Sequence, residues 1–197
     1  MIVTGLVLAA GSSRRLGRPK QLLPFRGVTL LDATLDVARA CGFAQLLVAV
    51  GGSSADVRSG VDLDGTTVVE NPEHGTGCSS SVAAALPVVD PAAQGLVLML
   101  GDQPGVDPAS VTALLAAASA GAPAAMCRYD NSLGHPIWFS RNLFHHLAEL
   151  QGDKAVWKLL HSGSIDVVEV PVAGPVPVDV DTWQDYEALV AADEVRR

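Results

Sequence analysis

The sequence predicts an α/β protein with an open, mostly parallel sheet. Short apolar runs typical of strands alternate with longer segments of helical spacing along the chain. The run Leu96–Leu100 is almost entirely apolar, as expected for a central parallel strand covered on both faces. With 197 residues, 49% of them hydrophobic, the chain can bury a large core. Because no linker or repeat divides it, we expect one domain over residues 1–197.

The first half of the chain alternates strands and helices. Leu31, Leu35 and Ala38 recur at helical spacing in a segment that ends at Gly42. A serine cluster opens a further helix after Gly77. The expected strands are Ile2–Ala9, Gln45–Val50 and Thr66–Val69, and the expected helices are Leu30–Cys41, Ser53–Gly60 and Cys78–Leu86.

The second half continues the alternation. Asp107 and Pro108 are typical of the N-cap and first position of a helix, which an alanine-rich stretch extends to Ala120. The other expected elements are strands at Leu96–Leu100, Pro123–Cys127 and Ile165–Val170, and helices at Ser140–Leu150, Lys154–His161 and Thr182–Ala192. In open α/β sheets ligands bind beyond the carboxyl ends of the strands, where Gly11, Asn71 and Asp102 are expected.

The charge pattern limits the classes of partner. The chain has 13 Lys and Arg against 21 Asp and Glu, a net charge of −8, and no acidic residue precedes Asp32. Five of the cations lie between residues 14 and 26, so the chain lacks the broad basic face that nucleic-acid binding needs. No apolar run could span a bilayer, no signal peptide is recognised, and three widely spaced cysteines predict reduced thiols in a cytoplasmic protein.

The loop after the first strand is a predicted polyphosphate site. A short apolar run stops at Gly11-Ser12-Ser13, and three arginines and a lysine follow. Backbone N–H groups at Ala10–Ser13, together with Arg15 and Lys20, can surround phosphate oxygens. The spacing fits neither a Walker A loop nor the dinucleotide fingerprint.

Carboxylates follow the apolar strand and precede the last helix. Asp102 comes directly after the strand Leu96–Leu100, where a carboxylate and phosphate oxygens could hold Mg²⁺. Asp179 and Asp181 lie on the same side of an extended segment, so both can face the site. One of them could complete the metal site and the other could cap the last helix.

Residues 6–25 resemble the signature of the MobA-like nucleotidyltransferases, most closely the branch that makes molybdenum cofactor cytidine dinucleotide. Shorter segments agree in order and spacing: Asn71-Pro72 with Gly77–Ser80, Gly101–Pro104, Gly134-His135-Pro136 and Val178–Thr182. The resemblance implies a Rossmann-like three-layer α/β/α fold of the nucleotide-diphospho-sugar transferase type. It also implies an enzyme in which a phosphorylated acceptor attacks the α-phosphorus of a nucleoside triphosphate and pyrophosphate leaves.

The resemblance also assigns residues to roles. Arg15, Lys20 and Asp102 would be catalytic, and Asp102 and Asp181 would bind Mg²⁺. His135, in a loop near the acceptor, and Trp157 would contact that acceptor. The nucleotide-binding residues would be Leu8, Ala9, Ala10, Gly11, Ser12, Ser13, Lys20, Asn71, Ser80 and Asp102. Because a phosphate acceptor is already ionised, His135 is not assigned as a general base, and a structural histidine in a Gly-His-Pro turn is an open alternative.

The base and the acceptor are less narrowly determined. The guanine-using branch has Gly where this chain has Ala10, whose methyl would crowd a purine, so CTP is favoured over GTP. Trp157 and Trp183 replace an Arg and a Pro that are usual in the family, which puts the molybdopterin acceptor in question. Two alternatives stay open: transfer to a sugar phosphate, and a non-catalytic protein that delivers the finished cofactor to a molybdenum hydroxylase.

Overall fold

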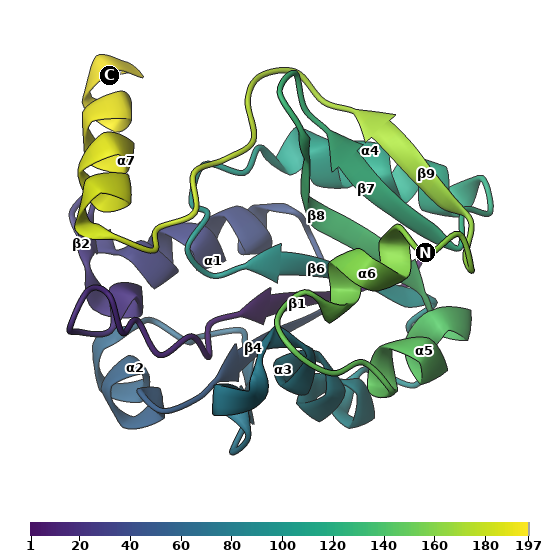
Figure 1. Cartoon of the computed structure of the whole chain (residues 1–197), viewed down its shortest axis with the longest axis horizontal. Coiled ribbons are helices and arrows are strands. Elements are labelled where there is room, and N and C mark those ends of the chain that lie inside the picture. The colour runs from purple at the N-terminus through teal and green to yellow at the C-terminus, as the bar shows by residue number, and fades with distance from the viewer. Residues whose placement is uncertain (197) are drawn as a thin grey trace.

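The computed structural model describes residues 1–196 and contains a seven-stranded sheet with the order β5-β4-β1-β6-β8-β7-β9 (Figure 1). Its strands are β1 Thr4–Leu8, β4 Gln45–Val50, β5 Thr67–Glu70, β6 Gly95–Leu100, β7 Ala124–Arg128, β8 Leu133–Ser140 and β9 Val167–Pro171. Only β8 runs antiparallel to its neighbours, so the predicted mostly parallel sheet is confirmed. A small hairpin of β2 (Pro24–Phe25) and β3 (Val28–Thr29), which the sequence analysis missed, lies outside this sheet.

Helices cover both faces of the sheet (Figure 1). They are α1 Leu30–Ala40, α2 Ser54–Gly60, α3 Cys78–Ala85, α4 Pro108–Ser119, α5 Phe144–Ala148, α6 Ala155–Leu160 and α7 Trp183–Arg196. Short 3₁₀ helices span Lys20–Leu22, His74–Thr76, Leu86–Val88 and Arg141–Leu143. Apolar residues of α1, α2 and α4 pack in one cluster, whereas those of α3, α5 and α6 pack in a second. No helix within residues 1–196 is long and apolar enough to cross a membrane.

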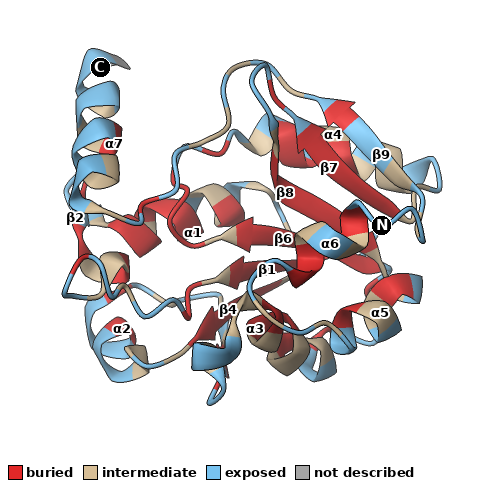
Figure 2. Ribbon diagram, in the orientation of Figure 1, coloured by how far each residue is buried: buried red, intermediate tan, exposed pale blue. Residues whose placement is uncertain are grey.

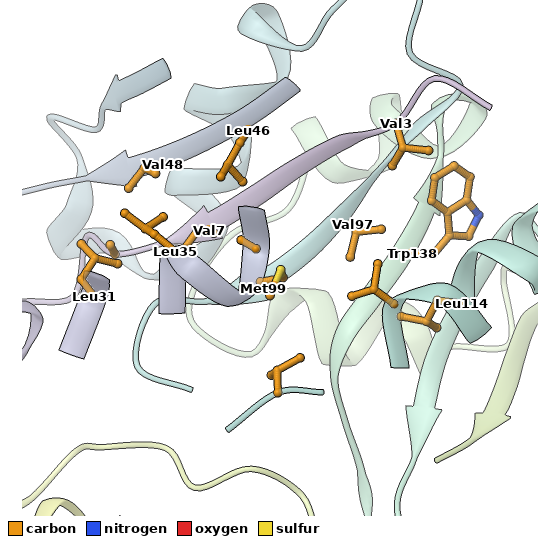
Figure 3. Packing of buried hydrophobic residues seen from close by; sticks show 14 of the residues in the cluster. Val3, Val7, Leu31, Leu35, Leu46, Val48, Val97, Met99, Leu114 and Trp138 are labelled. Carbon is orange, nitrogen blue, oxygen red and sulfur yellow. The ribbon is translucent and has the colours of Figure 1, made fainter. Parts of the chain in front are cut away.

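Successive strand residues supply the two cores in turn. In β4, Val48 joins the cluster on the α1 and α4 face, while Leu47 joins the cluster on the opposite face. Figure 3 shows Val48 beside Leu35 and other residues of the first cluster. The central strands are buried, whereas the outer surfaces of the helices are exposed (Figure 2). This alternation explains the continuous apolar runs, because each strand faces a helical layer on both sides.

The segment Gly134-His135-Pro136 lies in strand β8 and not in the expected loop or turn. Cys127 of β7 pairs with Gly134, but the preceding Met126 pairs with Ile137, so His135 and Pro136 are extra residues at an irregularity of the ladder. A proline cannot donate to a neighbouring strand and is tolerated at such a bulge. The sequence prediction was wrong because it treated Pro136 as a turn signal.

Helix ends are fixed by side-chain caps. Asp107 accepts a hydrogen bond from the Ala109 N–H group at 2.8 Å, which confirms the predicted start of α4. Before α7, however, the cap is Thr182, whose hydroxyl accepts from the Asp185 N–H group while Asp185 accepts from the Thr182 N–H group. Neither Asp179 nor Asp181 caps this helix, so both carboxylates remain available to the site.

We expect Val48→Ala to lower the free energy of unfolding by about 2 kcal/mol, because it removes two buried methyl groups and leaves a cavity. Val48 is fully buried in β4, whereas Val168 in β9 is 42% exposed. The matched control Val168→Ala should cost less than about 0.5 kcal/mol. Urea denaturation measures both, and equal losses would contradict this description of the core.

Candidate functional site

A cavity of about 690 Å³ opens at the carboxyl ends of β1 and β6. Most of the predicted site residues line it: Leu8, Ala9, Ala10, Gly11, Ser12, Arg15, Lys20, Asp102, His135, Trp157 and Asp181. Of the predicted nucleotide-binding residues, Ser13, Asn71 and Ser80 do not line it. The cavity is therefore formed by segments that span almost the whole chain.

The pairing of β1 with β6 places the loop beside Asp102. Leu8 and Leu100 are opposite each other in parallel register, and the Gly101 N–H group continues the ladder with a hydrogen bond to the Leu8 carbonyl at 2.9 Å. A Cβ on Gly101 would lie 2.9 Å from that same oxygen, so the close approach requires glycine here. The chain can then leave β6 directly against the loop after β1.

The loop after β1 presents unsatisfied donors to the cavity. Among residues 1–196, the backbone N–H groups of Ala10, Gly11 and Ser12 find no acceptor within the protein. The preceding N–H group, of Ala9, is used by the Ala49 carbonyl at 2.8 Å. Successive free N–H groups form a concave anion-binding site, so the geometry suits phosphate oxygens.

Gln21 is a residue of the site that the sequence analysis missed. Its side-chain amide donates to the carbonyl oxygens of Ala9 and Gly11, at 2.6 and 3.1 Å, and thereby fixes the conformation of the loop. The residue is 3% exposed, and its Oε1 atom has no partner. The sequence contained a signal for this role, because Gln21 directly precedes the apolar residues Leu22 and Leu23. A glutamine is seldom buried in such surroundings unless its side-chain amide forms hydrogen bonds.

Ser13 also supports the loop and does not line the cavity. Its hydroxyl accepts a hydrogen bond from the Lys20 backbone N–H group at 2.9 Å, and its own φ of 50° turns the chain. Its carbonyl accepts from the N–H groups of Leu16 and Gly17. Ser13 therefore links the loop after β1 to the segment that carries Lys20.

Lys20 forms ion pairs with Asp102 and Asp181, the two carboxylates that were predicted to bind a metal. Its Nζ atom lies 2.5 Å from Asp102 Oδ2 and 3.0 Å from Asp181 Oδ1. Arg15 approaches the other oxygen of Asp181 at 2.8 Å. Burial by itself would lower the pKa of Lys20, but the charges and hydrogen bonds of Asp102 and Asp181 together outweigh it and raise that pKa. For Asp181, burial is the largest single effect and raises the pKa, but the contributions of Lys20 and Arg15 together outweigh it and lower that pKa.

A third carboxylate, that of Asp179, faces the same cavity, as strand alternation predicted. Its Oδ1 atom accepts a hydrogen bond from the buried Gln103 amide at 2.6 Å, and the same amide reaches the Pro177 carbonyl at 3.1 Å. Desolvation, reinforced by the negative charge of Asp102, raises the pKa of Asp179 to about 6. Gln103 thus fastens the segment before α7 to the turn after β6.

Two carboxylates are the available metal ligands. Asp102 and Asp181 each place an oxygen within 3.0 Å of the same Lys20 nitrogen, so the two are close enough to share one cation. No group of three or more His, Cys, Asp or Glu residues within 1–196 could enclose a metal ion. The donor set fits Mg²⁺, which binds through one or two carboxylates and takes its other ligands from phosphate and water.

Aromatic side chains line the side of the cavity nearest α6. Trp157 meets His135 edge to face at 5.8 Å, and it stacks on His161 at 5.8 Å with an interplanar angle of 29°. Burial lowers the pKa of His135 to about 4, so the imidazole is neutral at pH 7. His135 can therefore exchange hydrogen bonds with a ligand but offers no positive charge.

Asn71 and Ser80 use their polar groups within the protein. The Asn71 amide donates to the hydroxyls of Ser80 and Ser81 at 2.8 and 2.9 Å, and its carbonyl oxygen accepts from the Glu73 N–H group. Ser80 in turn donates to the Gly77 carbonyl at 2.7 Å. Neither residue lines the cavity, but Asn71 is hydrogen-bonded to Ser81, which does line it.

We expect Asp179→Asn to stabilise the protein at pH 7.5 more than at pH 4.5. The pKa of Asp179 is raised to about 6, which means that the folded protein disfavours the ionised carboxylate. The free energy of unfolding therefore falls as the pH rises through 6, and asparagine, which does not ionise, avoids that loss. The asparagine keeps an oxygen for Gln103, and the gain should be below about 1 kcal/mol because the side chain is partly open to solvent. Thermal melts at both pH values measure it.

Asp166→Asn, which changes an exposed carboxylate outside the cavity, gives the baseline for this comparison. An identical gain from Asp179→Asn at pH 4.5 and pH 7.5 would show that its carboxylate titrates normally.

The chain is similar to several known proteins over almost its whole length. Purine catabolism protein PucB of Bacillus subtilis is 29% identical over 197 residues, and the match covers 94% of each chain. The crystal structure of Rv0371c from Mycobacterium tuberculosis H37Rv superposes with a TM-score of 0.91 at 53% identity, covering 97% of this chain and 98% of that one. A second structure of Rv0371c, in complex with manganese, gives 0.86 at 49% identity and covers 98% and 100%.

The loop after β1 and most of the residues that line the cavity lie within the segment that defines a family. The MobA-like NTP transferase domain matches residues 5–167, which include the loop, Lys20, Asp102 and Trp157. Asp181 lies beyond the matched segment but is joined to it through Lys20. The chain therefore belongs to the MobA-like family of nucleotidyltransferases.

Proposed function

We propose that this nucleotidyltransferase is Mg²⁺-dependent and moves CMP from CTP onto a phosphorylated acceptor of the molybdopterin type, releasing pyrophosphate. The observation that carries the proposal is the position of Lys20, Asp102 and Asp181 within ion-pair distance of one another, beside a loop with free N–H groups. A cation, two carboxylates and an anion-binding loop are what a metal-bound triphosphate requires.

The protein's own groups would position and neutralise the phosphates. The N–H groups of Ala10, Gly11 and Ser12 would bind the triphosphate, while Arg15 and Lys20 would offset the charge of the transferring and leaving phosphoryl groups. Asp102 and Asp181 would hold Mg²⁺, which when bound would withdraw charge from the phosphate oxygens. The manganese complex of the similar protein Rv0371c supports a divalent metal. No general base is needed, in keeping with a neutral His135.

The base preference rests on Ala10. Ala10 is 7% exposed and lines the cavity, so its methyl group would take up space beside a nucleotide bound there. A purine is larger than a pyrimidine, and crowding by one methyl group discriminates by about 1–3 kcal/mol. CTP is therefore favoured over GTP, by a modest factor.

The acceptor preference rests on Trp157 and His135. An indole that lies partly exposed in the cavity wall offers a flat apolar surface, and His135 beside it offers neutral hydrogen-bonding groups. A flat heterocycle such as a pterin would stack there, whereas a sugar phosphate would gain less from the indole. Trp157 stands where the family usually has arginine, so stacking replaces charge in this half of the site.

A panel of nucleotides and acceptors tests the proposal directly. CTP, GTP, UTP and ATP are each combined with molybdopterin or a sugar phosphate in the presence of Mg²⁺, and pyrophosphate release is measured. We expect CTP with molybdopterin to react fastest and GTP to be about tenfold slower. Preference for a sugar phosphate would reassign the acceptor, and tight binding of the finished dinucleotide without turnover would favour a carrier.

Asp102→Asn in the same assay should lower the rate of pyrophosphate release by about 100-fold or more, because it removes a charged metal ligand while keeping the shape of the side chain. Asp56→Asn, which changes an exposed carboxylate on α2, is the matched control and should leave the rate unchanged. An Asp102→Asn enzyme with full activity would remove Asp102 from the reaction.

Trp157→Leu should raise the KM for the acceptor by about tenfold and leave the KM for the nucleotide nearly unchanged, because in this proposal the indole stacks on the acceptor and does not contact the nucleotide. Trp157→Phe, which keeps a flat ring, should recover most of the loss. Steady-state kinetics with each substrate varied in turn separate the two KM values. A parallel rise in both would assign Trp157 to the packing of α6 and not to the acceptor.

A further inference from the structure

The Lys20 ammonium group occupies the space between the two carboxylates that would share a metal ion. Its Nζ atom donates to Asp102 Oδ2 at 2.5 Å and to Asp181 Oδ1 at 3.0 Å. Mg²⁺ binds carboxylate oxygens at about 2.0–2.1 Å. A divalent cation bound to both oxygens would share them with the ammonium group at close range, and because the two positive charges repel each other, the two arrangements compete.

We propose that Lys20 and the divalent cation compete for Asp102 and Asp181, and that Lys20 moves onto the triphosphate when metal and nucleotide bind together. This inference rests on the proposed function, because it takes the metal to be held by these two carboxylates. The inference also predicts how the ligands depend on each other. The metal binds weakly by itself, and it binds more strongly together with the nucleotide, because the nucleotide attracts Lys20 away from the carboxylates.

The Lys20 side chain is built to move without its backbone. The backbone N–H group is fastened to the Ser13 hydroxyl at 2.9 Å, within the short helix Lys20–Leu22. The side chain crosses the loop after β1, since a Cβ on Gly11 would lie 3.7 Å from Lys20 Cε. Rotation about side-chain bonds alone can swing the ammonium group from the carboxylates to an anion on that loop.

The ammonium group must leave as a cation. The ammonium group forms ion pairs with Asp102 and Asp181, at 2.5 and 3.0 Å, and its positive charge is what holds it there. The side chain is 16% exposed, and a charge in that position needs an anionic partner wherever it lies. A triphosphate on the free N–H groups of the loop supplies that partner, whereas a metal ion alone does not.

Arg15, like Lys20, forms an ion pair with Asp181 that a phosphate could replace. It contacts Asp181 Oδ2 at 2.8 Å, and its side chain is 66% exposed, so its exchange from carboxylate to phosphate costs little desolvation. Together the two residues can transfer two positive charges to the triphosphate as the divalent ion brings two to Asp102 and Asp181. The net charge around the carboxylates is thereby kept constant during assembly.

The test measures the binding of Mn²⁺ alone to the full chain, by the electron paramagnetic resonance signal of free Mn²⁺, with no nucleotide present. We expect Lys20→Met to bind Mn²⁺ about tenfold more tightly than the unchanged protein, because the competing cation is gone. Lys20→Arg, which keeps the charge, should bind Mn²⁺ as weakly as the unchanged protein. Lys20→Gln repeats the test without an apolar group near the carboxylates, and thermal melts verify that each variant folds.

Arg14→Met is the matched control for a general loss of positive charge. Arg14 lines the same cavity, but among residues 1–196 it contacts no carboxylate. Its substitution should change the dissociation constant for Mn²⁺ by less than about twofold. An effect as large as that of Lys20→Met would overturn the competition, because long-range charge would then explain both.

Asp102→Asn separates this inference from the proposed function. If it weakens Mn²⁺ binding while neither Lys20→Met nor Lys20→Gln strengthens it, the metal site stands and the competition is refuted. If Asp102→Asn leaves Mn²⁺ binding unchanged, the metal assignment itself fails, and the competition fails with it.

Discussion

The contact of Lys20 with Asp102 and Asp181 is the interaction on which the rest of the site depends. It ties together the short helix Lys20–Leu22 that follows the loop after β1, the turn after β6 and the segment before α7. Two carboxylates held this close repel each other unless a cation lies between them, and partial burial strengthens both effects. The same three side chains therefore hold the segments around the cavity together and supply the charges inside it.

The fold brings these segments together by apolar packing. A third cluster of buried residues, separate from the two faces of the sheet, joins the loop after β1, β2, α1, α7 and the segment before α7; its buried members are Leu16, Leu23, Phe25, Leu30, Ala33, Val180 and Leu189. Val180 is fully buried in this cluster, whereas its neighbours Asp179 and Asp181 line the cavity. Burial of one valine thus positions two carboxylates.

Much of the fold followed from local pattern. The apolar runs of β1, β4 and β6, the periodicity of α1 and the Asp107 cap of α4 were all readable, because each depends on residues close in the sequence. Strand β8 was missed, because Gly134 and Pro136 are turn signals unless neighbouring strands accommodate a bulge. Family resemblance named the loop residues, Asp102, Ser13, Asn71 and Ser80 together, and only the tertiary structure shows that the last three do not line the cavity.

The sequence by itself determined the alternation of strands and helices, the small-residue loop with its cluster of cations, and the presence of carboxylates after β6 and before α7. The tertiary structure alone decided which charges meet, since Lys20 and Asp181 are 161 residues apart. It also decided that Gln21 holds the loop and that burial keeps His135 neutral. Ion pairing and desolvation depend on distances in space and on exclusion of water, and local sequence pattern encodes neither.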